Sequence, residues 1–349
     1  MIKTAYYQDL TKMNTFGMKV KARCFIEYDS VADLVDIEFE ELARPVLHIG
    51  GGSNLLFTDD FKGTILHSKI NFIEILDDHE SQVLVSVGAG VVFDDFCDWA
   101  AKEGLWGIEN LSYIPGEVGA SAVQNIGAYG VEVKDVIRTV YCYDTVEEEF
   151  VKFDVSECGY GYRDSIFKNP EIKGRYIVTH VVFALSRTPQ PKLEYGHLDA
   201  AVKDAQSVKD AALTPSLIRK VIIKIRKEKL PEPSVTGSAG SFFKNPVISA
   251  EHFAKIQAAA KAEHGADCKV PHYDLPDGTV KVPAAWMIEQ CGWKGRRSGG
   301  AAVWDKQPLV IVNYTGDAYP EEIIGLERRI IESVKNRFGV ELHPEVDHI

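Results

Sequence analysis

The stretch GSAGSFFKNP, residues 237–246, combines residue types that suit a binding or catalytic loop. Its glycines and alanine let a backbone approach a ligand closely, and the paired phenylalanines supply an apolar wall. Ser241 adds a hydroxyl, while the lysine and Asn245 add a cation and an amide. The serine could act as a nucleophile, as a proton donor or as a structural hydrogen-bonding group.

The local pattern does not favour a nucleophilic serine. α/β-hydrolases place theirs in Gly-x-Ser-x-Gly at a strand-to-helix turn, whereas Phe242 and Phe243 follow Ser241. Neither Ser53 in GGGSN nor Ser121 in GASAV restores that motif. Because catalytic triads form in space and not in sequence, the ten histidines leave a hydrolase open as an alternative.

Two glycine-rich stretches, HIGGGSNLLF and PGEVGASAVQNIGAYG, indicate a ligand that needs close contact with backbone amides. Ser53, Asn54, Ser121 and Asn125 could add side-chain hydrogen bonds. A nucleotide cofactor is the natural candidate, yet the chain has neither a Gly-x-Gly-x-x-Gly fingerprint nor a Gly-Lys dipeptide. Each stretch taken alone could also be a plain turn.

Composition narrows the class of protein. A chain of 349 residues with 45% hydrophobic content predicts two or three domains with their own cores. The stretch MIKTAYYQDL lacks the apolar core of a signal peptide and no apolar run reaches about 18 residues, so we expect a cytoplasmic protein without a membrane partner. A formal charge of -12 argues against a nucleic-acid partner. The six cysteines are widely spaced, and no metal site is expected, in HPEVDHI or elsewhere.

Hydrophobic periodicity predicts the elements that must position these loops. Strands are expected at 45–50, 82–90, 136–144, 176–186 and 308–313, and helices at 30–42, 91–104, 249–262, 282–292 and 320–339. A further helix starts at Thr214, the predicted N-cap, and ends before Pro231 and Pro233. That proline-rich exit is the clearest candidate domain boundary.

Motifs along nearly the whole chain resemble those of UDP-N-acetylenolpyruvoylglucosamine reductases, the flavoenzymes that complete UDP-N-acetylmuramate for bacterial peptidoglycan. They are NTFG at 14–17, PVLHIGGGSNLL, IPGEVGASAVQNIGAYG, CGYGYRDSIFK, GSAGSFFKNP and HPEV, in the family's order and spacing.

The resemblance implies an α+β, three-domain flavoprotein with the FAD-binding fold of the vanillyl-alcohol oxidase type. The implied domains are residues 1–75, to which a strand in 338–349 returns, then 76–228, and a substrate-binding domain at 229–337. Gly50, Gly51, Gly52, Ser53 and Asn54 would lie against the FAD pyrophosphate, and Pro115, Gly116, Gly119, Ser121, Asn125, Gly127 and Gly130 would line the remaining flavin surface.

The implied reaction uses NADPH as co-substrate to reduce UDP-N-acetylglucosamine enolpyruvate, and we expect a monomer. Arg163 would bind the substrate carboxylate, because a guanidinium matches its planar shape. Ser241 would donate the proton that follows hydride addition, and Glu345 would assist the developing anion. Tyr162, Tyr195, Lys229, Asn245, Tyr273, Lys281 and Gln307 would contact substrate or nicotinamide, with Tyr195 on an added tyrosine loop.

The chain departs from the family at its end. An acidic residue usually precedes Pro-Glu-Val and an arginine usually follows two places after the glutamate, whereas here these places hold His343 and Asp347. How the tail is anchored is therefore open. Two rival functions also remain: an FAD-dependent oxidase of a small alcohol or sugar on the same fold, and a non-catalytic nucleotide-binding protein.

Overall fold

The computed structural model describes residues 1–209 and 211–349, which form two compact units. Unit 1 comprises Met1–Asp9, Lys21–Gly52 and Asp60–Lys227. Unit 2 comprises Leu10–Val20, Ser53–Asp59 and Glu228–Ile349. Each unit contains both helices and sheets, in agreement with the predicted α+β class.

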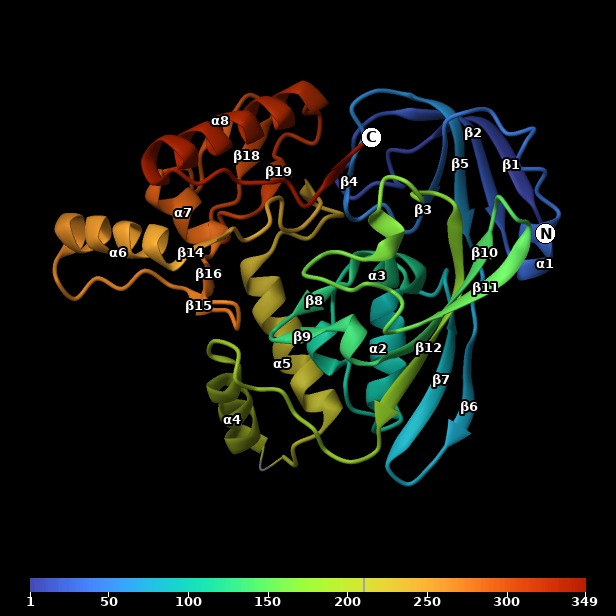
Figure 1. Cartoon of the computed structure of the whole chain (residues 1–349), viewed down its shortest axis with the longest axis horizontal. Coiled ribbons are helices and arrows are strands. Elements are labelled where there is room, and N and C mark those ends of the chain that lie inside the picture. The colour runs from blue at the N-terminus through green and yellow to red at the C-terminus, as the bar shows by residue number, and fades with distance from the viewer. Residues whose placement is uncertain (210) are drawn as a thin grey trace. The chain divides into compact units, whose positions relative to one another are not determined.

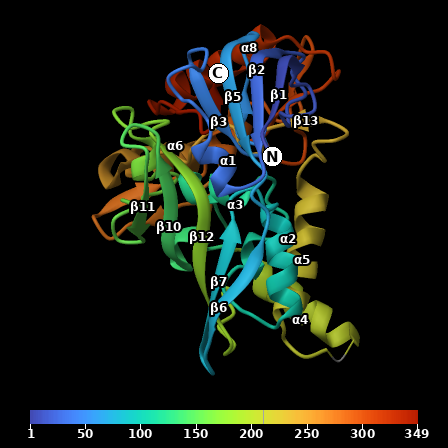
Figure 2. The same cartoon turned by 90° about the vertical axis from the view of Figure 1, so that its right-hand side faces the viewer.

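Unit 1 is built on two larger sheets, shown from two sides in Figures 1 and 2. In the first, with order β1-β2-β5-β3, β2 and β3 pair parallel with β5, and β1 pairs antiparallel with β2. The second, with order β11-β10-β12-β7-β6, is antiparallel throughout. The strands are β1 (Lys3–Asp9), β2 (Lys21–Tyr28), β3 (Val46–Ile49), β5 (Phe61–Ser68), β6 (Ile73–Asp78), β7 (Gln82–Gly88), β10 (Ile137–Asp144), β11 (Glu149–Asp154) and β12 (Tyr176–Ser186).

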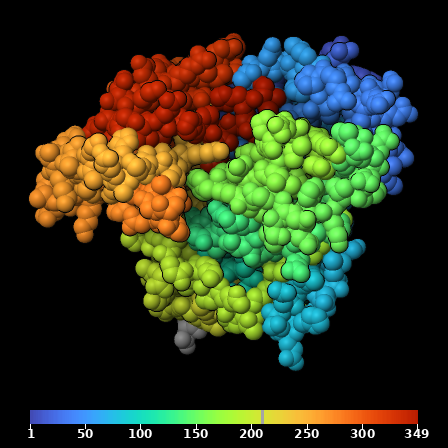
Figure 3. Space-filling model, viewed as in Figure 1, coloured from blue at the N-terminus to red at the C-terminus, as the bar shows by residue number. Residues whose placement is uncertain are grey.

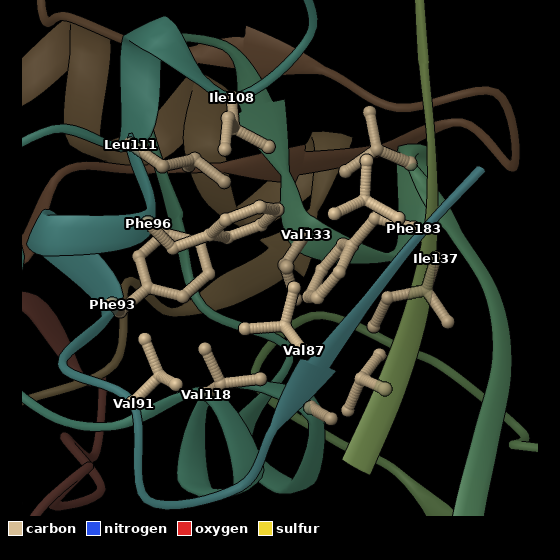
Figure 4. Packing of buried hydrophobic residues seen from close by; sticks show 14 of the residues in the cluster. Val87, Val91, Phe93, Phe96, Ile108, Leu111, Val118, Val133, Ile137 and Phe183 are labelled. Carbon is tan, nitrogen blue, oxygen red and sulfur yellow. The ribbon is translucent and has the colours of Figure 1, made fainter. Parts of the chain in front are cut away.

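Helices α2 (Phe93–Lys102) and α3 (Val118–Gln124) lie on one face of the five-stranded sheet. As predicted, α2 turns its apolar face into the core, where the rings of Phe96 and Phe183 lie 4.8 Å apart (Figure 4). Burial of one such phenylalanine is worth roughly 1.5–3 kcal/mol. This packing fixes α2, the helix that precedes the second glycine-rich stretch.

The helix expected at 30–42 is the clearest error of the sequence-based prediction. The observed α1 covers only Val31–Val35. Beyond it, Ile37 and Phe39 are both buried while the acidic residues beside them are exposed. One helical face cannot bury two positions that are two residues apart, so the core selects a non-helical backbone here.

The helix predicted after Thr214 is present as α5 (Pro215–Lys229), and it follows α4 (Leu198–Lys209). The Thr214 hydroxyl accepts the Leu217 N–H at 3.2 Å, which is the expected N-cap. Two short strands of unit 1, β8 (Gly127–Ala128) and β9 (Val131–Glu132), pair at the end of the second glycine-rich stretch.

Unit 2 contains the sheets β13-β19-β18-β17 and β14-β16-β15 and the strand pair β20-β4. In Figure 3 the orange surface around α6 forms one end of this unit. Its helices are α6 (Ala250–His264), α7 (Ala284–Gln290) and α8 (Pro320–Phe338), and its strands are β4 (Leu55–Leu56), β13 (Gly237–Ser238), β14 (Val247–Ser249), β15 (Tyr273–Asp274), β16 (Thr279–Lys281), β17 (Arg297–Ser298), β18 (Ala301–Val303), β19 (Ile311–Asn313) and β20 (Asp347–His348). In the portion of the chain that is described, no helix is both long and apolar enough to cross a bilayer.

Candidate functional site

The two glycine-rich stretches meet within unit 1. A Cβ atom at Gly51 would lie 3.5 Å from the Cα atom of Gly116, and one at Gly50 would lie 3.0 Å from Ala120 Cβ. Gly116 has φ +125°, which side chains rarely allow. The backbone of Gly116 therefore favours glycine, and Gly50 has little room for a side chain where the loops adjoin. We call residues 50–52 and 115–120 the glycine cradle.

Main-chain hydrogen bonds fix the second half of the cradle. The Gly116 carbonyl accepts the Phe93 N–H at 3.0 Å, and the Gly119 N–H donates to Ala89 O at 3.0 Å. A Cβ at Gly119 would lie only 2.9 Å from Ala89 Cβ. This part of the cradle, which begins at Pro115, thus packs on the segment that joins β7 to α2.

Two predicted cofactor contacts, Ser121 and Asn125, use their side chains inside the protein. The Ser121 hydroxyl donates to Val118 O at 2.7 Å. Asn125 is fully buried, donates to Gly161 O at 2.8 Å and accepts the Lys134 N–H at 3.2 Å. These bonds support the loop that continues to Gly127 and Gly130, and a cofactor contact by these two residues remains a prediction.

Arg163 lies in a tight turn, with φ +54°. Gly161 and Asp164 exchange main-chain hydrogen bonds of 3.0 and 3.2 Å around it. Its guanidinium donates to Asn125 O at 3.2 Å and to Gly127 O at 2.6 Å, and it lies 5.3 Å from the centre of the Tyr162 ring. The planar cation is therefore oriented by the backbone of the glycine-rich stretch before any substrate is present.

A trio of hydrogen-bonded titratable side chains includes Glu117 of the cradle, and sequence reasoning missed it. His67 contacts Glu27 Oε1 through Nδ1 at 3.1 Å and Glu117 Oε1 through Nε2 at 2.9 Å. Glu117 Oε2 is buried without a hydrogen-bond partner among the described residues, and a Cβ at Gly50 would lie 3.3 Å from it. No spacing pattern links these three positions in the sequence.

The serine loop, residues 237–246 of unit 2, buries its phenylalanines and exposes Ser241. The Glu345 N–H donates to Phe242 O at 2.8 Å, and the Lys244 N–H donates to His343 O at 2.9 Å. The segment around the loop thus pairs with the segment His343–Glu345. This pairing brings the neighbour of Ser241 and the backbone of Glu345 together within one unit.

Main-chain pairing anchors the tail despite the substitutions at His343 and Asp347. β20 pairs parallel with β4, and the Asp347 N–H donates to Asn54 O at 3.0 Å. The Asn54 side chain, predicted to contact the cofactor, donates to Glu345 O at 3.0 Å. His348 Nε2 lies 3.2 Å from Glu327 Oε2, and that carboxylate raises the pKa of His348.

Three predicted substrate residues of unit 2 gather around the sheet β14-β16-β15. Tyr273 and Lys281 are register partners, with the Lys281 ammonium 5.6 Å from the centre of the tyrosine ring. Asn245 lies just before β14, and its Oδ1 accepts the Ala284 N–H at 2.9 Å, at the start of α7. A cation, an aromatic ring and an amide are thus close in the fold.

Two others, Lys229 and Gln307, are joined by the turn at 304–310. The Trp304 indole donates to Lys229 O at 3.1 Å, and Gln307 Oε1 accepts the Leu309 N–H at 3.3 Å. The Leu309 carbonyl in turn accepts the Phe242 N–H at 2.8 Å, so this turn also contacts the serine loop. Tyr195 belongs to unit 1, where its ring meets that of Tyr129 edge to face at 6.0 Å.

The predicted residues are therefore divided between the units. Unit 1 contains Gly50, Gly51, Gly52, Pro115, Gly116, Gly119, Ser121, Asn125, Gly127, Gly130, Tyr162, Arg163 and Tyr195. Unit 2 contains Ser53, Asn54, Lys229, Ser241, Asn245, Tyr273, Lys281, Gln307 and Glu345.

Two family models and several known proteins match this chain. Residues 22–150 match the FAD binding domain, and residues 232–349 match the C-terminal domain of UDP-N-acetylenolpyruvoylglucosamine reductase. The UDP-N-acetylenolpyruvoylglucosamine reductase of Bacteroides fragilis is 50% identical over 341 residues, which cover 97% of this chain and 98% of that protein. The Porphyromonas gingivalis enzyme of the same name is 45% identical over 345 residues, 97% of each chain.

A solved structure shares the fold. The crystal structure of UDP-N-acetylenolpyruvylglucosamine reductase from Thermus caldophilus superposes with a TM-score of 0.66 at 22% identity, covering 100% of this chain and 98% of that one. At this identity the likeness concerns the fold. Together with the FAD binding domain it confirms the predicted fold class.

Proposed function

The chain belongs to the UDP-N-acetylenolpyruvoylglucosamine reductase family, and from this premise we propose how its own residues divide the work of the reaction. It is an FAD-dependent oxidoreductase of peptidoglycan precursor synthesis. It reduces UDP-N-acetylglucosamine enolpyruvate to UDP-N-acetylmuramate, with NADPH as co-substrate. The rival interpretation as an oxidase of a small alcohol or sugar is not favoured by these relatives.

The glycine cradle fits FAD because a pyrophosphate needs close approach to backbone amides, and five of the nine cradle residues are glycines, which leave those amides uncovered by side chains. We assign the cradle, with Ser53, to holding the nucleotide part of the cofactor. When bound, FAD supplies the hydride-transfer chemistry between NADPH and the enolpyruvyl group. The protein's own residues bind, orient and protonate the substrate.

Arg163 binds the carboxylate of the enolpyruvyl group. Addition of hydride to the terminal carbon of that group pushes negative charge onto the neighbouring carbon and its carboxylate. A guanidinium already held by Asn125 O and Gly127 O can stabilise that charge without reorganising. Lysine would lack the planar fork.

Ser241 donates the proton to the carbon that carries this charge. An alcohol is a weak acid, but a carbanion is a strong enough base to take its proton, so no neighbouring general base is needed. One observation supports this assignment above others: the Glu345 N–H donates to Phe242 O at 2.8 Å. This bond holds the backbone of Glu345 against the residue that follows the exposed Ser241, which supports a shared role for the two residues.

The remaining assignments concern binding. We propose that Lys229, Asn245 and Tyr195 contact the substrate diphosphate, and that Tyr162, Tyr273, Lys281 and Gln307 make further substrate or nicotinamide contacts. Tyr273 and Lys281 offer an aromatic ring and a cation close together. This combination suits the base and the diphosphate of a nucleotide. We also propose a cytoplasmic monomer with the domain boundaries near residues 75 and 228.

The test separates the two half-reactions of the FAD-loaded protein. In Ser241→Ala, we expect NADPH to bleach the flavin absorption at nearly the normal rate. Reoxidation by UDP-N-acetylglucosamine enolpyruvate should slow by roughly 10²–10⁴-fold, the usual contribution of a positioned acid. Rapid-mixing absorption measurements without oxygen give both rates.

Ser238→Ala is the matched control, since Ser238 lies in the same loop but is buried. It should not slow reoxidation selectively. Equal losses in both half-reactions of Ser241→Ala would refute the proton-donor role.

A further inference from the structure

Asn110 is a fully buried side chain that joins two segments distant in sequence. It lies in a short 3₁₀ turn, Glu109–Leu111. Its Nδ2 donates to Tyr129 O at 2.9 Å and to Lys192 O at 2.7 Å. Both protons of one carboxamide are thus used to clamp the loop after β8 to the segment that precedes Tyr195.

The clamped segment has little regular structure of its own. Residues 189–194 form neither helix nor strand, and Tyr195 is 44% exposed. Leu193 packs against the cluster around Trp106 and Ile218. The Tyr195 Cβ lies 3.5 Å from the Cβ position of Gly130. We call residues 189–197 the tyrosine segment; its continuation into α4 forms yellow-green surface of unit 1 in Figure 3.

We propose that Asn110 is a positioning residue for substrate binding, which holds the tyrosine segment docked before substrate arrives. This inference rests on the proposed function, in which Tyr195 contacts the substrate diphosphate. A segment without sheet or helix bonds would otherwise have to be ordered on binding, and that ordering would weaken affinity. Asn110 avoids this loss of affinity because it holds the segment that carries Tyr195 in place. It does not itself contact the substrate.

The chemistry of the clamp requires an amide. Two carbonyl oxygens converge on one nitrogen, so the residue must supply two donors from a single planar group. Its own Oδ1 is buried and lacks a hydrogen-bond partner within the described ranges, so the donors alone carry the connection. Asn110→Asp, which has nearly the same shape, would face the same carbonyls with an acceptor.

The experiment is a double-mutant cycle of Asn110→Ser and Tyr195→Ala. If Asn110 acts through Tyr195, Asn110→Ser should raise the KM for UDP-N-acetylglucosamine enolpyruvate by about tenfold, as expected for two lost hydrogen bonds. The same replacement should change KM little once Tyr195 is alanine. The rate of flavin reduction by NADPH should change by a smaller factor than the KM.

A second readout needs no activity. Hydrogen exchange of the FAD-free protein should show faster exchange of the amides at 189–197 in Asn110→Ser. Asn110→Asp should have an equal or larger effect. Leu193→Ala provides a variant that loosens the same segment without disturbing the buried 3₁₀ turn, so a folding failure of the Asn110 variants does not end the test.

Asn14→Ser is the matched control. Asn14 is also buried, and its Nδ2 also donates to two carbonyls, Leu10 O at 2.8 Å and Met18 O at 3.1 Å. Any effect it has on KM should add to that of Tyr195→Ala, and exchange at 189–197 should stay normal.

The outcomes separate the inference from the proposed function. If Tyr195→Ala leaves KM unchanged, the substrate role of Tyr195 fails, while fast exchange in Asn110→Ser still supports the docking. If Tyr195→Ala raises KM but Asn110→Ser adds its full effect in the double variant, the positioning role is overturned. Unchanged exchange at 189–197 in Asn110→Ser and Leu193→Ala overturns it as well.

Discussion

The glycine cradle of unit 1 and the serine loop of unit 2 use similar residue types in opposite ways. In the cradle, the missing side chains matter, because a Cβ at Gly50 would meet Ala120 at 3.0 Å. In the serine loop, Gly240 would accept a Cβ with nothing within 4 Å, although its φ is +70°. There the large side chains of Phe242 and Phe243 are buried, and the small polar residue is exposed.

The polar side chains of the two regions also differ in whether they turn into the protein or toward solvent. Ser121 and Asn125 turn back into unit 1 and hold its loops, whereas Ser241 is exposed beside a strand pairing that holds its neighbours. The proposed cofactor surface and the proposed point of proton delivery therefore place different demands on the same amino acids. Adding atoms should damage the cradle, and removing atoms or anchors should damage the serine loop.

The largest expected change in stability concerns the trio of Glu27, His67 and Glu117. His67→Leu leaves the carboxylates of Glu27 and Glu117 without the imidazole between them. Leaving a buried polar group without its hydrogen-bond partner typically costs 1–3 kcal/mol, and more for a carboxylate, so we expect about 3 kcal/mol. Urea unfolding of the FAD-free protein, followed by fluorescence, measures this loss.

The double variant His67→Leu, Glu117→Leu is the control, since it removes one of the two stranded carboxylates. It should be more stable than His67→Leu alone. If the two variants unfold at the same urea concentration, the trio does not stabilise the support of the cradle as the geometry indicates.

A direct comparison of the two loops comes from adding a side chain to each. Gly50→Val should weaken FAD binding by about tenfold to 100-fold, because overpacking typically costs 1–3 kcal/mol. Gly240→Ala should leave FAD affinity almost unchanged and slow reoxidation by substrate instead. Titration of the FAD-free proteins with FAD gives the affinities. Equal losses of affinity in both variants would remove the distinction between the loops.

Several parts of the fold and site follow from local patterns in the sequence. The periodicity of α2 and the cap at Thr214 are local signals, and both are confirmed. The family motifs predict the cofactor and the reaction class, and the relatives and the FAD binding domain confirm both. The helix expected to continue past Val35 was wrong, since burial of Ile37 and Phe39 overrides local periodicity.

Contacts that join distant parts of the chain could not be predicted in this way. The trio of Glu27, His67 and Glu117 and the clamp made by Asn110 have no motif, because their partners meet only in the folded chain. Asn54 illustrates the same limit. Its motif indicates a cofactor contact, but its amide donates to the carbonyl of Glu345, 291 residues away.

Asn54→Ala therefore tests whether the Asn54 side chain contacts the cofactor or anchors the C-terminal segment. Loss of one hydrogen bond to Glu345 O is worth about 1 kcal/mol, so reoxidation by substrate should slow by about fivefold to tenfold. FAD affinity should change less. Thr58→Val removes another side-chain donor to the tail, a 2.7 Å bond to Ile349 O, and should affect reoxidation less because it lies further from Glu345. A greater loss in FAD affinity than in reoxidation would support the cofactor contact predicted from the motif.

The smallest effect concerns the pH dependence of the tail's anchorage. The Glu327 carboxylate, with a smaller contribution from Asp347, raises the pKa of His348 above its usual value of 6.5, while burial and Arg328 oppose the shift. A raised pKa in the folded state means that protonated His348 stabilises β20 fully below the unfolded pKa, and this stabilisation is lost as pH rises through the folded pKa. Because His348 is partly exposed and screened by solvent, we expect it to stabilise the tail by at most about 0.5 kcal/mol.

Hydrogen exchange of the Asp347 and Ile349 amides, which donate to Asn54 O and Leu56 O, reports this anchorage directly. Compared at each pH with His348→Gln, the protein should show extra protection at acidic pH that disappears at alkaline pH. Equal protection in the two proteins at every pH would assign the anchorage to main-chain pairing alone and leave the His348–Glu327 contact without a stabilising role.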